Sequence, residues 1–183
     1  MATIDEGEFD LILPDCPWPE TGGGGRGTAK HYRTVPWDEM PALLLGSPYW
    51  RPARSFWLGL WATKTSLPYA MSLLTAAGTR YVTTWTWIKT TGQQLIHRGM
   101  GQYGAHGVEF ILWGKRGTVG RLKTADKEMA DFDAPVSPTH SEKPAIAYQK
   151  ALRVFAHTRP LEMFARTERE GWESCGDGVG RGW

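Results

Sequence analysis

An acid and an indole lie close together near the start of the chain, in the tetrapeptide Asp15-Cys16-Pro17-Trp18. An apolar run from Phe9 to Leu13 precedes it, and four consecutive glycines begin at Gly22. In an open α/β sheet, a carboxylate at the carboxyl end of a strand points into the crevice where ligands bind, and Trp offers a face for stacking. The pattern suggests chemistry on a flat, nitrogen-bearing ring. A solvated Asp beside a core Trp explains it equally well, because short motifs recur by chance.

The elements that must position this tetrapeptide follow from the apolar pattern of the chain. Short apolar or alternating runs predict strands at 9–13, 55–61, 80–89, 107–113 and 161–165, with one last strand within 171–178. Helical spacing and early prolines predict helices at 35–45, 67–77 and 144–157. The polar stretch 114–142 reads as a long loop. Alternating strands and helices predict an α/β fold with a mostly parallel sheet and helices on both faces.

Length and composition limit the class of protein. The chain has 183 residues and no internal repeat, so we expect one domain over residues 1–183 without a separate target-recognition domain. Cys16 and Cys175 show neither CxxC nor zinc-ligand spacing, so we expect no disulfide framework and no metal. The acidic amino terminus and the lack of a stretch of ~20 apolar residues predict a cytoplasmic protein with no membrane partner.

Basic residues concentrate in one part of the chain, although the formal net charge is only +2. The cluster consists of Arg98, Lys115, Arg116, Arg121, Lys123 and Lys127. It is either a solvated loop or a contact for phosphate groups. The 10 Trp residues indicate that several indoles line a core or a base-stacking pocket.

Several further segments follow the tetrapeptide in a specific order. They are Lys30-His31-Tyr32-Arg33-Thr34, FWLGLWAT at 56–63, Trp87-Ile88-Lys89-Thr90, GQYGAHGVEFILWG at 101–114, Ser141-Glu142-Lys143-Pro144 and LEMFAR at 161–166. In this order, over about residues 9–178, the chain resembles the MT-A family of adenine-N6 methyltransferases. That family includes the catalytic subunit of the messenger-RNA methylation complex and many bacterial and phage DNA enzymes. The resemblance implies a Rossmann-like methyltransferase sheet whose catalytic segment precedes its S-adenosylmethionine segment.

The resemblance assigns the chemistry to the tetrapeptide. An adenine amine is a poor nucleophile because its lone pair is delocalised into the ring. Hydrogen-bond acceptors must therefore draw the amine nitrogen toward tetrahedral geometry. The Asp15 carboxylate and the Cys16 main-chain carbonyl would accept the two amine hydrogens and stabilise the developing positive charge. Pro17 would stiffen the loop, and Trp18 would stack on the base or wall it in. Methyl transfer would then be direct and in line, on an adenine that is unpaired or flipped out of a duplex.

The resemblance also implies which residues hold the cofactor and the substrate. S-adenosylmethionine would bind at Asp15, Lys143, Glu162, Arg166, Arg169, Asp177 and Gly178. The nucleic acid would bind at Tyr32, Tyr103, His106 and Glu109. We also expect it to bind at Lys115 and Arg116, not from the resemblance but because they belong to the basic cluster and would contact phosphate groups. Structural roles remain open for three of them: Glu162 as the cap of a turn, His106 as a loop histidine and Arg166 in an ion pair.

The chain departs from the family pattern at several of these positions. Cys16 stands where the family usually has Pro, which keeps the carbonyl but loses the rigidity of the ring. Glu168-Arg169 and Asp177 replace the usual polar pair and Asn, so the contacts to the cofactor ribose stay open. Longer members of the family place a segment that recognises the cofactor adenine before the first strand. Few residues precede that strand here, so we expect another part of the chain to cover the cofactor adenine.

We therefore expect an adenine-N6 methyltransferase that acts on nucleic acid, DNA in preference to RNA, as a monomer or homodimer. The main alternative is a non-catalytic nucleic-acid-binding subunit of a methyltransferase complex, against which the retained Asp15 and Trp18 argue. A cytosine-carbon methyltransferase that uses Cys16 as nucleophile is a weaker alternative, because those enzymes place Pro before Cys and no His is near in sequence. Sequence preference would come from the loops 21–33, 91–104 and 117–142.

Overall fold

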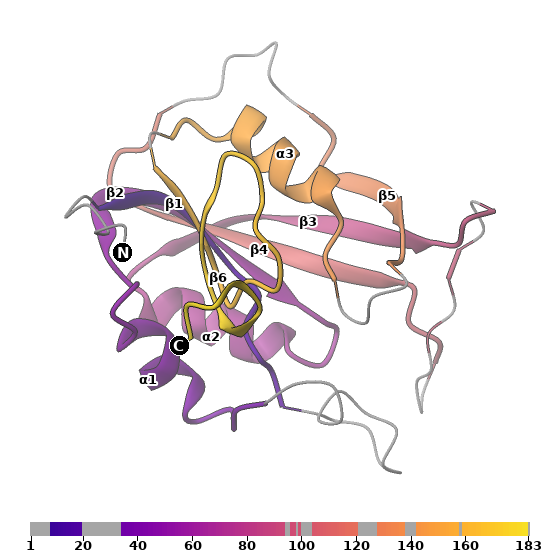
Figure 1. Cartoon of the computed structure of the whole chain (residues 1–183), viewed down its shortest axis with the longest axis horizontal. Helices are drawn as coiled ribbons and strands as arrows, with labels where there is room; N and C mark the ends of the chain where they lie inside the picture. Colours follow the sequence, from indigo (N-terminus) through magenta and orange to yellow (C-terminus); the bar gives the residue numbers. More distant parts are fainter. Residues whose placement is uncertain are drawn as a thin grey trace.

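The computed structural model describes residues 8–19, 34–93, 96–97, 99, 104–120, 128–137, 142–157 and 159–182. Its strands are β1 (Phe9–Pro14), β2 (Pro52–Ala62), β3 (Arg80–Thr90), β4 (Val108–Arg116), β5 (Asp131–Pro135), β6 (Pro160–Met163) and β7 (Glu173–Cys175). Its helices are α1 (Met40–Leu45), α2 (Leu67–Ala76), α3 (Ala145–Val154) and the short 3-10 helix η3 (Asp177–Val179). The strands form a 7-stranded sheet in the order β5-β3-β4-β2-β1-β6-β7 (Figure 1).

The sheet is mostly parallel, which confirms the predicted Rossmann-like α/β class. Every described strand runs in the same direction except β4, which is antiparallel to both of its neighbours, β2 and β3. The carboxyl ends of the parallel strands therefore meet the amino end of β4 at one edge of the sheet. We call this the catalytic edge, because Asp15, which the family resemblance predicts to be catalytic, directly follows β1 there. The carboxyl end of β4 lies at the opposite edge.

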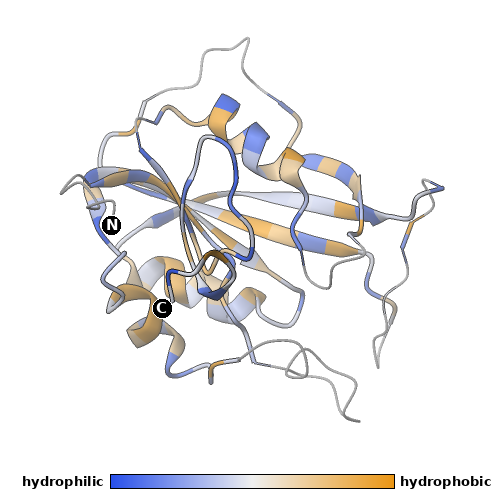
Figure 2. Ribbon diagram, in the orientation of Figure 1, coloured by the Kyte–Doolittle hydropathy of each residue, from blue (hydrophilic) through white to orange (hydrophobic). Residues whose placement is uncertain are grey.

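Helices cover both faces of the sheet, with α3 on one face and α1 and α2 on the other (Figure 1). Alternate residues of β1 point to opposite faces, as the pleat of a strand requires: Ile12 packs on the side of α1 and α2, and Leu11 and Leu13 pack on the side of α3. Figure 2 shows hydrophobic residues along α1 and in the middle of the sheet. Indoles fill the core beneath α3, and these are Trp57, Trp61, Trp85, Trp87, Trp113 and Trp172.

Packing of these indoles explains one glycine in β2. A Cβ at Gly59 would lie 2.6 Å from the ring of Trp113, which is too close for any other residue unless the ring moved. The Trp113 ring on β4 therefore fills the space that Gly59, which has no side chain, leaves free on β2.

Two sequence predictions about the elements were wrong. The stretch 114–142 is not a continuous loop, because β4 extends to Arg116 and β5 adds an edge strand parallel to β3. The β5 sequence Asp-Phe-Asp-Ala-Pro buries Ala134 but exposes two acids, so it lacks the apolar signal of a strand. Helix α1 begins at Met40, later than predicted, because Pro41 is tolerated only in the first turn of a helix.

No helix among the described residues is long and apolar enough to cross a membrane.

Candidate active site

Backbone hydrogen bonds anchor the Asp15-Cys16-Pro17-Trp18 tetrapeptide at the catalytic edge. The Asp15 N–H donates to the carbonyl of Met163 at the end of β6 (3.1 Å). The Cys16 carbonyl accepts the Trp18 N–H (2.8 Å), and the Pro17 carbonyl accepts the Val35 N–H (3.0 Å). A carbonyl oxygen has two lone pairs, so the Cys16 carbonyl keeps one for a further donor.

The Trp18 side chain is fixed by its polar edge. Its indole Nε1 donates to the carbonyl of Trp61 near the end of β2 (2.8 Å). This bond fixes the orientation of the ring through an atom on the ring edge and does not occupy either face. The indole is half-buried and packs against the core on the side of α1 and α2.

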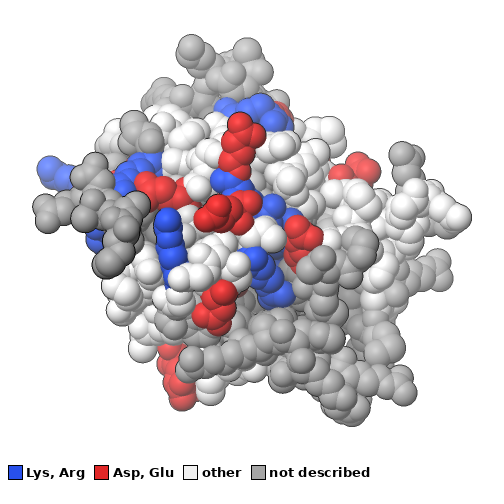
Figure 3. Space-filling view, in the orientation of Figure 1, with Lys and Arg blue, Asp and Glu red and all other residues white. Residues whose placement is uncertain are grey.

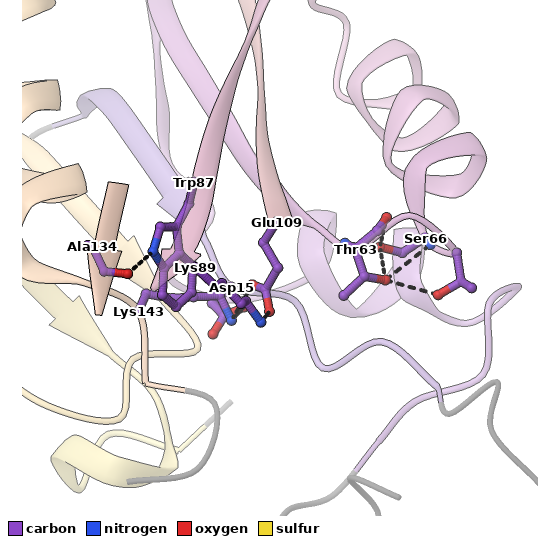
Figure 4. A network of polar contacts seen from close by, with 9 residues as sticks. Asp15, Thr63, Ser66, Trp87, Lys89, Glu109, Ala134 and Lys143 are labelled. Atoms are coloured by element: carbon purple, nitrogen blue, oxygen red, sulfur yellow. Dashed lines mark hydrogen bonds and ion pairs between the residues drawn. The ribbon is translucent and has the colours of Figure 1, made fainter. Parts of the chain in front are cut away.

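Four charged side chains, Asp15 among them, form a series that alternates in sign (Figure 4). The Lys143 ammonium lies 3.0 Å from the Asp15 carboxylate and 3.4 Å from that of Glu109, and the Lys89 ammonium lies 2.5 Å from Glu109. We call these residues the charge chain, in the order Asp15, Lys143, Glu109, Lys89. They come from the end of β1, the segment before α3, the start of β4 and the end of β3.

The antiparallel direction of β4 is what completes the charge chain. Glu109 is the second residue of β4, and the register pairs it with Trp87 near the end of β3. A parallel β4 would carry Glu109 to the opposite edge of the sheet. Trp87 also supports Lys89, whose ammonium lies 4.9 Å from the centre of the indole ring. Trp87 Nε1 in turn donates to the Ala134 carbonyl of β5 (2.9 Å; Figure 4).

Burial and opposite charges compete within the charge chain, and the charges prevail. Burial alone would raise the pKa of Glu109, but the ammonium groups of Lys143 and Lys89 lower it below its ordinary value. Burial alone would lower the pKa of Lys143, but the carboxylates of Asp15 and Glu109 raise it above its ordinary value. Glu109 and Lys143 are therefore both charged at neutral pH.

A second polar cluster joins β6 to α3. Arg169 Nε lies 3.1 Å from a carboxylate oxygen of Glu162, its guanidinium lies 3.9 Å from the centre of the Tyr148 ring, and another guanidinium nitrogen donates to the Lys143 carbonyl (3.1 Å). Glu162 is only 2% exposed. Burial raises the pKa of this carboxyl to about 7 despite the neighbouring guanidinium. Arg169 thus connects this second cluster to the charge chain through the main-chain carbonyl of Lys143.

The loop after β6 is held in an unusual conformation. Phe164 has a φ of 61°, in the left-handed region that residues with a side chain rarely occupy. The chain around η3 packs directly on this loop: a Cβ at Gly178 would lie 2.3 Å from the Arg166 backbone, and one at Gly176 2.3 Å from that of Ala165. The two glycines therefore permit a backbone-to-backbone contact that brings the η3 segment onto Arg166.

The profile of the MT-A70 family matches residues 9–178. The chain belongs to the MT-A70 family. This is the family of adenine-N6 methyltransferases, and the match makes the chain a methyltransferase of the S-adenosylmethionine-dependent class. A search of curated protein sequences finds no match.

The structure brings many of the predicted site residues of this MT-A70 protein to the catalytic edge. Asp15, Lys143 and Glu109 lie in the charge chain, and Glu162 and Arg169 bind each other next to it. Loops that leave the same edge carry the remaining predicted cofactor residues, which are a half-buried Arg166 and an exposed Asp177 and Gly178.

The other predicted substrate residues that the structure describes are divided between the two ends of β4. His106 is half-buried in an isolated bridge with Gly99, just before β4 and so on the side of the catalytic edge. Lys115 and Arg116 lie at the carboxyl end of β4, at the opposite edge of the sheet from Asp15. An Arg116 guanidinium nitrogen donates there to the Ala53 carbonyl (3.0 Å). Two further predictions, Tyr32 and Tyr103, lie outside the described residues.

Lys89 was missed as a site residue. The segment Trp87-Ile88-Lys89-Thr90 supported the family resemblance, yet no role was given to its cation. The available signal was its position, since Lys89 is the one charged residue after Arg80 in a strand of aromatic and β-branched residues. Its partner Glu109 could not be inferred, because 20 positions separate the two in sequence.

The described residues fit the cofactor that MT-A70 methyltransferases generally use, S-adenosylmethionine. Its amino-acid end carries one ammonium and one carboxylate, and the Asp15 and Lys143 side chains offer the complementary charges side by side. These two residues would hold that end, with Arg166 and Asp177 on the side of β6. Among the described residues, no group of three or more His, Cys, Asp or Glu side chains could hold a metal ion.

Proposed function

We propose that this MT-A70 protein transfers a methyl group from S-adenosylmethionine to the N6 amine of adenine in nucleic acid, with DNA as its substrate in preference to RNA. One observation carries the proposal. The buried Asp15 carboxylate adjoins the main-chain carbonyl of Cys16 and the indole of Trp18, whose orientation is fixed by the hydrogen bond from its Nε1. An amine with two hydrogens attached to a flat base fits this combination of two acceptors and one stacking surface.

The proposed chemistry needs two hydrogen-bond acceptors that hold the amine while it reacts. The cofactor supplies the methyl group on a positively charged sulfur. Asp15 and the Cys16 carbonyl accept the two amine hydrogens and direct the nitrogen lone pair out of the ring plane. The nitrogen becomes positive as the new bond to carbon forms, and the Asp15 carboxylate stabilises this charge. The nitrogen then passes one proton to the Asp15 carboxylate, which leaves a neutral methylated amine and a neutral Asp15 carboxyl group.

Lys143 gives the Asp15 carboxylate a defined position before the base arrives. Its ammonium lies between two carboxylates, at 3.0 Å from Asp15 and 3.4 Å from Glu109. When the amine donates to Asp15, the ammonium can turn toward Glu109 without becoming an unpaired buried charge. Lys89 keeps Glu109 ionised for this purpose, since its charge helps to lower the pKa of Glu109.

A cysteine nucleophile is disfavoured by the surroundings of Cys16. Burial, followed by the neighbouring charge of Asp15, raises the pKa of this thiol well above its ordinary value. A neutral, buried thiol is a poor nucleophile, because the thiolate is the reactive form. The proposed reaction uses the Cys16 carbonyl and leaves the thiol inert.

The alternative of a non-catalytic nucleic-acid-binding subunit loses support from the charge chain. Burying four charged groups is costly unless each is paired. A platform that only binds nucleic acid would gain nothing from a carboxylate held this way beside Trp18. Charge does not favour either function, since acidic and basic side chains intermingle on the described surface seen in Figure 3.

Labelled methyl transfer tests the proposal directly. The wild type and Asp15→Asn would be incubated with S-adenosylmethionine and single- and double-stranded DNA and RNA, followed by nucleoside analysis. We expect N6-methyladenine from the wild type and at least a ~100-fold loss with Asp15→Asn. Asp133→Asn, an exposed acid on β5, is the matched control. Methylated cytosine, or full activity of Asp15→Asn, would contradict the mechanism, and cofactor binding without any transfer would favour the platform.

A further inference from the structure

Three aromatic rings form a series that leads outward from the tetrapeptide. The ring centres of Trp18 and Trp37 are 5.8 Å apart with an angle of 31° between the planes. Trp37 and Tyr69 are stacked, with ring centres 3.9 Å apart and an angle of 13°. The series thus begins at the residue proposed to contact adenine and ends on α2.

Hydrogen bonds hold the segments that carry the outer two rings. The Val35 N–H donates to the Pro17 carbonyl, which ties the turn containing Trp37 to the tetrapeptide. Tyr69 lies in the first turn of α2, whose start is fixed by a hydrogen bond from the Thr63 N–H to the buried Ser66 hydroxyl (2.8 Å; Figure 4). The positions of both rings are therefore set by the elements that build the catalytic edge.

The stacked pair does not belong to the hydrophobic core. Among the described residues, neither Trp37 nor Tyr69 is part of the two buried clusters or of the side chains packed against them. Tyr69 is 43% exposed although one of its faces lies on Trp37, so the exposed area includes the other face. An aromatic ring that is held in place and open on one face is the usual platform for an unpaired nucleobase.

We propose that Trp37 and Tyr69 form a binding site for the base next to the target adenine, which stacks on the outward face of Tyr69. This inference rests on the proposed function, because it makes the substrate a single-stranded segment of at least two nucleotides. The target adenine enters beside Trp18, and its neighbour follows the ring series outward. Stacking accepts any base, so the site contributes affinity and placement rather than sequence preference.

Local charge makes this site different from a phosphate contact. Asp38 and Glu39 are exposed beside Trp37, and Lys64 is exposed five residues before Tyr69. These acids would repel a phosphate more than the single Lys would attract it. Binding through Tyr69 should therefore depend little on salt, whereas phosphate contacts weaken steeply as salt rises.

The test compares Tyr69→Ala with Tyr69→Phe on single-stranded heptanucleotides that contain one central adenine, made as DNA and as RNA. A second set carries abasic nucleotides on both sides of the adenine. For the intact oligonucleotide we expect Tyr69→Ala to raise KM about 5- to 100-fold, with kcat within about twofold. Tyr69→Phe keeps the ring and should match the wild type within about twofold. On the abasic set, wild type and Tyr69→Ala should have the same raised KM.

Binding measured by fluorescence anisotropy with S-adenosylhomocysteine present separates this inference from the proposed function. If the wild type methylates no adenine, the function fails, and anisotropy still reports whether Tyr69→Ala weakens binding of the intact heptanucleotide. Unchanged binding and KM in Tyr69→Ala would overturn the stacking site. An equal loss on the abasic set would also overturn it, as would an equal loss in Tyr81→Ala, which removes a Tyr of similar exposure (42%) at the opposite edge.

Discussion

The Asp15 carboxylate lies 3.0 Å from the Lys143 ammonium, so the proposed acceptor of the adenine amine is already paired with a cation. Each side chain is about nine-tenths buried, with exposed fractions of 10% and 9%. The pair serves two purposes in the proposed reaction. It offers opposite charges to the amino-acid end of the cofactor, and it holds the carboxylate toward the space beside Trp18.

Removing the cation of this pair should destabilise the protein. Lys143→Met would leave Asp15 and Glu109 without their shared partner, and an uncompensated buried charge costs about 3–5 kcal/mol. We expect the free energy of unfolding in urea to fall by about that amount. Lys64→Met, at an exposed position, should change it by less than about 0.5 kcal/mol. A loss from Lys143→Met as small as that of Lys64→Met would show that the pair is not a structural requirement.

Lys89 should act on the reaction through Glu109. Without its ammonium, one of the two charges that lower the pKa of Glu109 is lost, and the pKa of this carboxyl should rise. A carboxyl with a lowered pKa is ionised down to acidic pH, so Lys89→Met should move the acidic limb of the kcat/KM profile to higher pH. Lys89→Arg keeps the charge and should restore the wild-type limb. A uniform loss of activity at every pH would instead indicate a purely structural role.

Glu162 should make stability fall as pH rises. Its pKa is raised from 4.5 to about 7 in the folded protein, so the folded state binds more protons than the unfolded state between these values. Its contribution to stability is fully present below pH 4.5 and is lost as pH rises through about 7, a change of about 3 kcal/mol. Urea unfolding from about pH 4 to about pH 8 should show this decline in the wild type but not in Glu162→Gln. The exposed Glu168→Gln should keep the decline, and a decline that persists in Glu162→Gln would refute the assignment.

Lys115 should affect binding without affecting the reaction. It lies at the carboxyl end of β4, at the opposite edge of the sheet from Asp15, so it can reach only a nucleic acid that extends around the protein. If Lys115 contacts phosphate as predicted, Lys115→Ala should weaken binding of long substrates alike on every sequence. Lys115→Ala should also reduce, by about one, the magnitude of the slope of the logarithm of the binding constant against the logarithm of the salt concentration. The Lys115→Ala variant should bind heptanucleotides as tightly as the wild type does. A changed base preference with unchanged affinity would contradict a phosphate contact.

Elements with a periodic apolar signal were predictable from sequence. The strand at 9–13, the strand at 55–61 and the helix at 67–77 all occur, because each buries a face whose spacing is visible in the residues themselves. β5 was not predictable, since an edge strand of Asp, Phe, Asp, Ala and Pro gains its stability from pairing with β3 rather than from its own composition.

The candidate site divides in the same way. Asp15 and Trp18 could be identified from sequence because they stand in one short motif after a strand, and the ordered segments downstream identified the family. That Lys143 bridges Asp15 and Glu109, that Lys89 supports Glu109, and that Lys115 and Arg116 lie at the far edge depended on the reversed direction of β4. The sequence by itself therefore determined the family and the residues proposed to carry out its chemistry. Only the tertiary structure decided which charges meet, because strand direction and register arise from pairing between segments far apart in the chain.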